Sequence, residues 1–293
     1  MRITQQMVHQ SSVRQMNQNL GRFDKISNQV STGKLLQRPS DDPFGVSQSM
    51  NLKSSIAANE QFERNISNAS LWLDETDQVM NQTVNVLHRA RELAVQGNSE
   101  TMSDQDREVI AKEVEELAEQ LRQFANTQVN GKYLFNGQKT NQPPYPEQDS
   151  YKTNSFDSGA VTFAVADGVN IKANLTANEL FGSAEDETNL FKTLENLAIS
   201  LRSGESTPLE AMDKGLDRVL TTWAEFGAVT ERVEAVENRL KDSNVQLQSM
   251  LSKIEDIDYA EAVTKLKSEE SIYQASLSVT SKIIQSSLID FIR

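Results

Sequence analysis

The sequence predicts a mainly α-helical protein in which long amino- and carboxy-terminal helices pack as a coiled-coil rod, with a small β-rich insert domain. Apolar residues recur at heptad spacing near both ends of the chain, and one segment of the middle alternates with period two. We expect terminal helices at residues 1–44 and 260–293, a helical core at 45–138 and 188–259, and the insert at 139–187.

The first helix is expected to present one narrow apolar stripe. Alternating spacings of three and four separate its members, and the flanking residues are mostly polar. A stripe this narrow cannot stabilise an isolated helix in water, so the segment needs a partner helix. We define the amino-terminal seam as Val13, Met16, Leu20, Phe23 and Val30, with the polar Ser27 between the last two.

The stretch RPSDDPFG at residues 38–45 separates the first helix from the second. Gly33 interrupts the heptad pattern, and because Pro39 disfavours helical backbone at Arg38, we expect the first helix to end there. Ser40 or Asp41 can accept hydrogen bonds from the free amides of the next helix, and carboxylates favour its positive end. Pro43 suits the first turn, which needs no amide donor at that position.

Two acidic side chains in this stretch could instead bind a cation or move a proton. Helix capping accounts for every residue, so we interpret the stretch as structural. The predicted helix joint consists of Pro39, Ser40, Asp41, Asp42 and Pro43.

Two more helices are expected before the insert. One stripe covers residues 66–94 and ends at Gly97, and Ser103 with Asp106 indicates a capped helix start before a second stripe at 110–124. The sequence NGKYLFNG at 130–137 then holds two Asn-Gly turn signals around a short strand-like core.

The insert differs in pattern from its surroundings. The proline-rich stretch NQPPYP at 141–146 marks a boundary, and apolar residues alternate with polar or small ones over 161–165 and 169–175. Asp167-Gly168 lies between these two runs and is typical of a two-residue hairpin turn. We therefore expect a small β unit here.

The last third of the chain returns to helical spacing. A long stripe runs from Val229 to Ile257, the phase slips at Asp258-Tyr259, and a new stripe then begins. An uncovered apolar stripe of this length predicts an interaction surface, and we expect both terminal segments to be disordered in the isolated protein. We define the carboxy-terminal seam as Tyr259, Val263, Leu266, Tyr273, Leu277, Ile284 and Phe291.

Composition argues against several classes of function. The net charge is −13, and residues 61–259 alone carry −16, which disfavours a surface for nucleic acid. The chain has no cysteine, no Gly-rich phosphate loop, no Gly-x-Ser-x-Gly or His-Glu-x-x-His pattern, and no apolar run long enough to cross a membrane. We predict no catalytic, cofactor-binding or metal-binding residues, no nucleic-acid partner and no membrane insertion.

The first residues lack a cleavable secretory signal, so export would need another route.

Several of these segments together resemble the flagellin family. They are the Ser-Asp-Asp-Pro joint after a helix containing STGK, the helix beginning NISNASLWLDETDQVM, and the turn NGKYLFNG. The resemblance covers roughly residues 1–138 and 205–293 but not the insert. The ending YQASLSVTSKIIQSSLIDFIR and the YLFNG turn are more similar to family members that join the hook to the filament than to filament subunits.

The resemblance implies a structural protein rather than an enzyme. Subunits would form a ring with copies of themselves between hook-associated protein 1 and flagellin, after secretion through the flagellar type III export channel. An export chaperone would hold the carboxy-terminal seam in the cytoplasm. Two alternatives stay open, namely flagellin itself and a cytoplasmic coiled-coil scaffold, although a scaffold would have no reason to carry a β insert between two adhesive ends.

Overall fold

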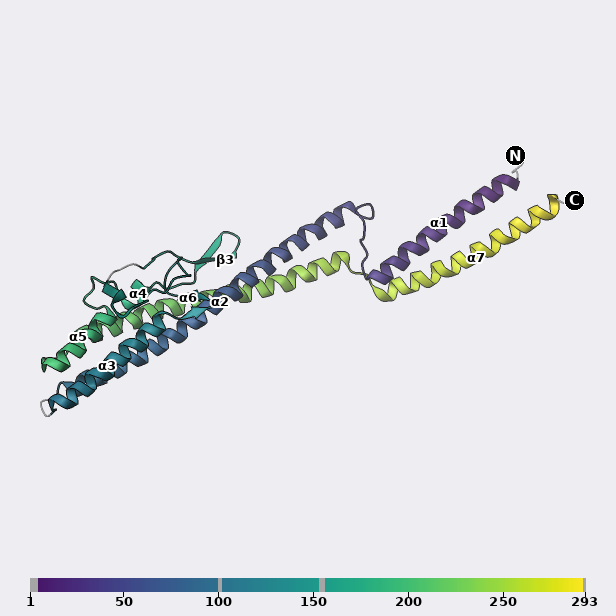
Figure 1. The fold of residues 1–293 in the computed structure, drawn as a ribbon. Helices are drawn as coiled ribbons and strands as arrows, with labels where there is room; N and C mark the ends of the chain where they lie inside the picture. Colours follow the sequence, from purple (N-terminus) through teal and green to yellow (C-terminus); the bar gives the residue numbers. More distant parts are fainter. Residues whose placement is uncertain (1–4, 100–101, 153–155, 292–293) are drawn as a thin grey trace. The chain divides into compact units, whose positions relative to one another are not determined.

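The computed structural model describes residues 5–99, 102–152 and 156–291 and confirms the mainly α-helical fold (Figure 1). The α-helices are α1 (Gln5–Thr32), α2 (Pro43–Gly97), α3 (Asp104–Ala125), α4 (Ala177–Phe181), α5 (Leu190–Ser203), α6 (Leu209–Glu255) and α7 (Tyr259–Phe291). The antiparallel pairs are β1 (Gln128–Val129) with β2 (Lys132–Tyr133), and β3 (Thr162–Ala166) with β4 (Val169–Lys172). A short 3₁₀ helix, η1, covers Gln148–Lys152.

Local capping and turn signals in the sequence act as expected. The Ser103 hydroxyl accepts a hydrogen bond from the Asp106 amide at 3.2 Å, and the Asp106 carboxylate accepts one from the Ser103 amide at 3.4 Å. This capping box satisfies two amides that the first turn of α3 would otherwise leave unpaired. The Asp167-Gly168 hairpin is also confirmed, because Ala166 pairs with Val169 across a two-residue turn.

The expected end of the first helix is wrong. Helix α1 ends at Thr32, before Arg38 and Pro39 are reached. The next residue, Gly33, has a φ of 71°, in the left-handed region that ends helices and favours glycine. A Cβ at Gly33 would also lie 2.9 Å from the Tyr259 hydroxyl oxygen. The helix therefore ends where the chain approaches the start of α7, and residues 33–42 form the connection to α2.

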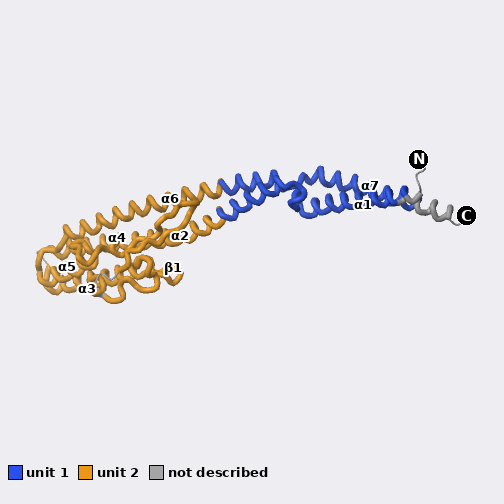
Figure 2. The backbone as a smooth tube through the Cα atoms, turned by 90° about the horizontal axis from the view of Figure 1, so that it is seen from above, with its two compact units in different colours: residues 1–58, 243–293 blue, residues 59–242 orange. Residues whose placement is uncertain are grey.

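The chain divides into two compact units, which Figure 2 shows in different colours. Unit 1 comprises residues 1–58 and 243–293, and unit 2 comprises residues 59–242. Helices α2 and α6 each contribute residues to both units. Because each unit has its own packing, the two are described separately below.

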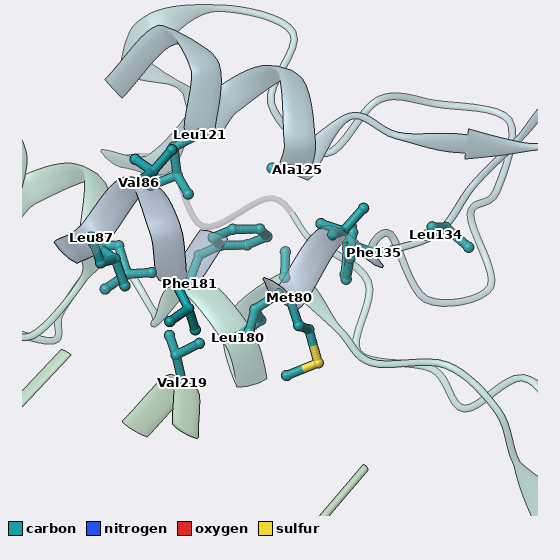
Figure 3. Close-up of a cluster of buried hydrophobic side chains, with 14 of the residues drawn as sticks. Met80, Val86, Leu87, Leu121, Ala125, Leu134, Phe135, Leu180, Phe181 and Val219 are labelled. Carbon is teal, nitrogen blue, oxygen red and sulfur yellow. The ribbon is translucent and has the colours of Figure 1, made fainter. Parts of the chain in front are cut away.

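Unit 2 contains the hydrophobic core. Helices α2 and α6 are antiparallel there: the Trp223 indole nitrogen donates to Asp77 at 2.7 Å, and Arg91 contacts Asp213 at 2.7 Å. Helix α3 packs beside α5. The chain segment that connects these two helices, residues 126–189, contributes aromatic rings that pack on the core. Figure 3 shows part of this core, including Met80, Leu87, Leu121, Phe135, Phe181 and Val219.

Unit 1 is built differently. Helices α1 and α7 lie side by side in opposite directions, as both views show (Figures 1 and 2). Among the described residues of this unit, Ala262 is the one buried hydrophobic residue. Apolar side chains that are only half covered contribute a fraction of the roughly 25 cal/mol per Å² that complete burial provides. The described residues of unit 1 therefore make contacts between helices but form no core.

Candidate assembly surfaces

The amino-terminal seam lies along the face of α1 that approaches α7. All five of its residues are half-buried. The Phe23 ring stacks on the Tyr273 ring, with centroids 6.2 Å apart, and Arg22 contacts Glu269 of α7 at 3.3 Å. Asn19 is buried on the same face and accepts a hydrogen bond from Arg22 at 2.6 Å. Sequence reasoning missed Asn19 because a polar residue does not belong to an apolar stripe.

The carboxy-terminal seam does not lie on a single face of the α1–α7 pair. Leu266 and Tyr273 are half-buried, whereas Tyr259, Val263 and Leu277 are exposed. The side chains of Ile284 and Phe291 lie outside the described residues. The covered row of α7 also has heptad spacing, but it consists of Ala262, Leu266, Glu269, Tyr273, Ser276 and Thr280.

Because this row is the one that α1 covers, other apolar side chains of α7 are not covered by α1. Ile272 and Val279 are exposed, yet both line a groove of about 320 Å³ between α1 and α7. The other residues of the groove are small or polar, so it is not filled from within: Ser12, Gln15, Asn19, Ala275, Ser276 and Thr280. Such a face is what a partner helix can cover.

Exposed apolar side chains are concentrated in unit 1. Twelve of the seventeen large hydrophobic residues that are exposed in the described structure belong to it, although it is the smaller unit. Eleven of them lie on helices α1, α2, α6 and α7, including Phe44, Met50, Val245 and Met250, and Leu35 lies in the connection after α1. Scattered single residues would need no explanation, but here the exposed apolar residues are concentrated in the unit whose described residues form no buried core.

The connection after α1 is held by a buried carboxylate. Glu255, at the end of α6, is 5% exposed, and its carboxylate contacts Lys34 at 2.8 Å and Lys53 at 2.7 Å. The Ser49 hydroxyl donates to the same group at 3.2 Å. Backbone bonds join the same segments, because the Leu35 amide donates to the Glu255 carbonyl at 2.6 Å. Sequence reasoning missed this cluster, whose members come from three separate segments.

Glu255 should make its contribution only while it is ionised. Burial disfavours the charged form, but the hydrogen bonds from Lys34 and Lys53 outweigh burial and lower the pKa of Glu255 below its ordinary value. A carboxyl whose pKa is lowered by folding stabilises the folded form above the unfolded pKa of about 4.3. That stabilisation is lost as the pH falls through the lower, folded value.

We therefore predict that Glu255→Gln loosens the packing of α2 on α6 at neutral pH. The local opening free energy should fall by about 1–2 kcal/mol, since both lysines are half-exposed and screened. Hydrogen exchange of the amides around Ser49, Lys53 and Glu255 measures this. The difference between the two proteins should shrink below pH ~4. The exposed Glu261→Gln serves as the control, and a pH-independent difference would contradict the role of the charge.

The two aspartates of the predicted joint have different partners. Asp42 precedes α2, and its carboxylate accepts a hydrogen bond from the Phe44 amide at 3.1 Å, so Asp42 is the cap rather than Ser40 or Asp41. Asp41 accepts from Lys25 at 2.8 Å and from the Arg38 amide at 3.1 Å, contacts that lower its pKa. Pro43 is the first residue of α2, and Pro39 and Ser40 are exposed.

Replacing the cap should affect only the start of α2. Asp42→Ala is expected to cost about 1 kcal/mol of local stability, because the Phe44 amide loses its acceptor. Asp41→Asn should have little effect on the start of α2. The single side-chain oxygen of asparagine can keep the hydrogen bond from the Arg38 amide, and the lost ion pair with the exposed Lys25 contributes little. Exchange of the Phe44 and Val46 amides checks both variants. A metal-dependent activity lost in Asp41→Asn would contradict a purely structural joint.

Unit 2 has a larger groove, of about 500 Å³, between α3, η1 and α5. Its acidic side chains are largely paired with cations: Arg202 contacts Glu115 at 2.7 Å, and Lys152 contacts Glu195 at 3.1 Å and Asp149 at 2.6 Å. Within the described residues there is no group of three or more potential metal ligands. No helix in the described part of the chain is both long and apolar enough to cross a membrane.

Two family models match this chain. The bacterial flagellin N-terminal helical region matches residues 3–140, and the bacterial flagellin C-terminal helical region matches residues 209–292. The chain belongs to the flagellin family. The two matches contain α1 to β2 and the whole of α6 and α7, so the seams and the joint fall within the flagellin regions, while β3, β4 and α5 lie between them.

Individual members of the flagellin family align over nearly the full chain. Flagellar hook-associated protein 3 of Escherichia coli is 29% identical, with 94% of this chain and 95% of that protein covered. The flagellin of Bacillus subtilis is 24% identical, with 94% of each chain covered. The crystal structure of flagellar hook-associated protein 3 from Legionella pneumophila shares the fold, with a TM-score of 0.61 at 17% identity over 70% of this chain and 98% of that one.

Proposed function

We propose that this protein is hook-associated protein 3 of a bacterial flagellum and forms the junction between hook and filament. The proposal rests chiefly on the alignment with the Escherichia coli junction protein, which extends over 94% of this chain. The concentration of exposed apolar residues in unit 1 supports it, because a ring subunit must cover such a surface with neighbouring subunits.

In this role the protein is structural and not an enzyme. Copies of the chain form a ring, with hook-associated protein 1 on the hook side and flagellin on the other. The terminal segments, 1–44 and 260–293, are the least stable part of the isolated protein and become a fully ordered coiled coil on assembly, whereas 45–138 and 188–259 form the helical core and 139–187 the insert. The lack of a buried apolar core in unit 1 supports this division.

Export before assembly requires that the adhesive surface be kept covered. The chain leaves the cell through the flagellar export channel as an unfolded polypeptide. An export chaperone binds the carboxy-terminal seam in the cytoplasm and so prevents early polymerisation. The exposure of Tyr259, Val263 and Leu277 supports a surface that is available to such a partner.

Immunogold labelling of isolated flagella tests the proposal. Antibody against this protein should label one band at the hook end of each filament, and deletion of the gene should leave hooks without filaments while flagellin is found in the medium. Label along the whole filament would instead identify flagellin, the second candidate favoured by the 24% identity with the Bacillus subtilis protein. Label confined to the cytoplasm would support a scaffold and overturn both.

A further inference from the structure

We propose that Asn130 is a site of spontaneous deamidation and isomerisation in the folded protein. The chain contains two Asn-Gly dipeptides, Asn130-Gly131 and Asn136-Gly137. In the reaction the Gly131 nitrogen attacks the side-chain carbonyl carbon of Asn130, the new C–N bond closes a succinimide ring, and ammonia leaves. Water then opens the ring at either carbonyl and leaves aspartate or isoaspartate at position 130. The reaction needs no enzyme or oxidant.

The surroundings of Asn130 permit this reaction. Asn130 and Gly131 are both exposed and form the two-residue turn between β1 and β2, with φ values of 52° and 76°. Apart from Gly131 and its two chain neighbours, no atom lies within 4 Å of the position of a Cβ on Gly131, so no other part of the chain packs against this side of the turn. Within the part of the chain that the structure describes, neither the Asn130 side chain nor the Gly131 amide has a hydrogen-bond partner.

The second dipeptide is held by packing. Asn136 is 4% exposed; its side-chain nitrogen donates to the Gln142 carbonyl at 3.0 Å, and its side-chain oxygen accepts from the Asp157 amide at 3.2 Å. A Cβ on Gly137 would lie 2.4 Å from the Asp157 carbonyl oxygen, so the backbone there is enclosed. Ring closure at Asn136 requires this structure to open first, whereas ring closure at Asn130 requires only a change in an exposed turn.

The hairpin that carries Asn130 should open at low cost. Strands β1 and β2 have two residues each, and a two-stranded hairpin of this size has little stability of its own. If the reaction requires a local opening, its rate falls about tenfold for each 1.4 kcal/mol that the opening costs.

The product changes the turn itself. Isoaspartate adds one carbon to the main chain of a two-residue turn, and conversion to either product places a carboxylate near Lys132. The Val129–Lys132 register should not survive isoaspartate formation.

The test follows both sites in one sample. The folded full-length chain is incubated in mildly alkaline buffer, and its peptides are mapped by mass spectrometry. The peptide with Asn130 should gain about 1 Da with time, and the peptide with Asn136 should react at least about tenfold more slowly. In concentrated urea the two rates should become similar, because each asparagine is followed by glycine.

Methylation by a protein isoaspartate methyltransferase gives an independent readout. The methyl groups should appear on the peptide that contains Asn130 and should be absent from that peptide in Asn130→Gln. Asp167-Gly168 can also form isoaspartate without a mass change, so the label must be assigned by peptide. If Asn130 stays unchanged in the folded chain but converts in urea, or if both sites react equally in the folded chain, the inference is wrong.

Discussion

Leu277→Asp is expected to abolish assembly at the hook end of the filament without changing the stability of the isolated protein. Leu277 lies on α7 and is 41% exposed, and the described residues of unit 1 form no core that it could disturb. The new carboxylate is therefore hydrated in the monomer. In the proposed ring it would be covered by a neighbouring chain, and the lost apolar contact together with the buried charge should cost several kcal/mol per contact.

The measurement compares two exposed leucines. Leu220, on α6 in unit 2, is 40% exposed, so Leu220→Asp introduces the same charge at equal exposure on the unit that has its own core. Both purified variants should have the circular dichroism and melting temperature of the parent protein. Cells with Leu277→Asp should release flagellin into the medium, and cells with Leu220→Asp should build filaments. Normal filaments in both strains would show that this part of α7 is not an assembly surface.

The start of α3 and the turn between β3 and β4 were predicted correctly, because both depend on residues that are close together in the sequence. The Ser103 capping box and the Asp167-Gly168 turn require only side chains and dihedral angles within four residues, and both were predicted. The end of α1 was not. Pro39 restricts the residue before it, but Gly33 ends the helix at the point where Tyr259 approaches from the other end of the chain. Gly33 is itself a local signal for the end of a helix, but the sequence alone does not show that Tyr259 approaches at this point, and the prediction relied on Pro39 instead.

The face of α7 illustrates a second limit. The predicted seam and the covered row share Leu266 and Tyr273, and both have heptad spacing. Choosing members by hydrophobicity selected Val263 and Leu277, whereas the covered row uses Ala262, Ser276 and Thr280, which let two helices approach closely. A helix that carries apolar residues on two faces has two possible partners. Periodicity locates both faces but does not say which one the same chain covers.

Glu255 was missed for a related reason. A single glutamate three residues before the phase slip is ordinary in a sequence with 42 acidic residues. Its role comes from Lys34, Lys53 and Ser49, which other segments bring within hydrogen-bond distance. Buried ion clusters are tertiary features, and sequence patterns reveal them only where their members share one helix or one turn.

The second large effect is expected in unit 2, where Phe181→Ala should lower the free energy of unfolding by about 3–5 kcal/mol. Phe181 is completely buried at the end of α4 (Figure 3). Its ring packs against Phe135 at 5.6 Å, Tyr145 at 5.8 Å and Phe191 at 5.6 Å between centroids. Truncation removes the area buried by the ring and its edge contacts, and it leaves a cavity that these neighbours can fill only in part.

Tryptophan fluorescence provides the measurement, because Trp72 and Trp223 both belong to unit 2. For a unit of this size the loss should lower the melting temperature by on the order of 10 °C. Phe44→Ala is the matched control: Phe44 is 79% exposed in unit 1, so its removal should change stability by no more than about 0.5 kcal/mol. An equal loss in both variants would contradict the division into a unit with a core and a unit without one. A small effect at Phe181 with a large effect at Phe44 would mean that unit 1, and not unit 2, stabilises the isolated protein. The stability would then lie in the helices that we propose become fully ordered on assembly.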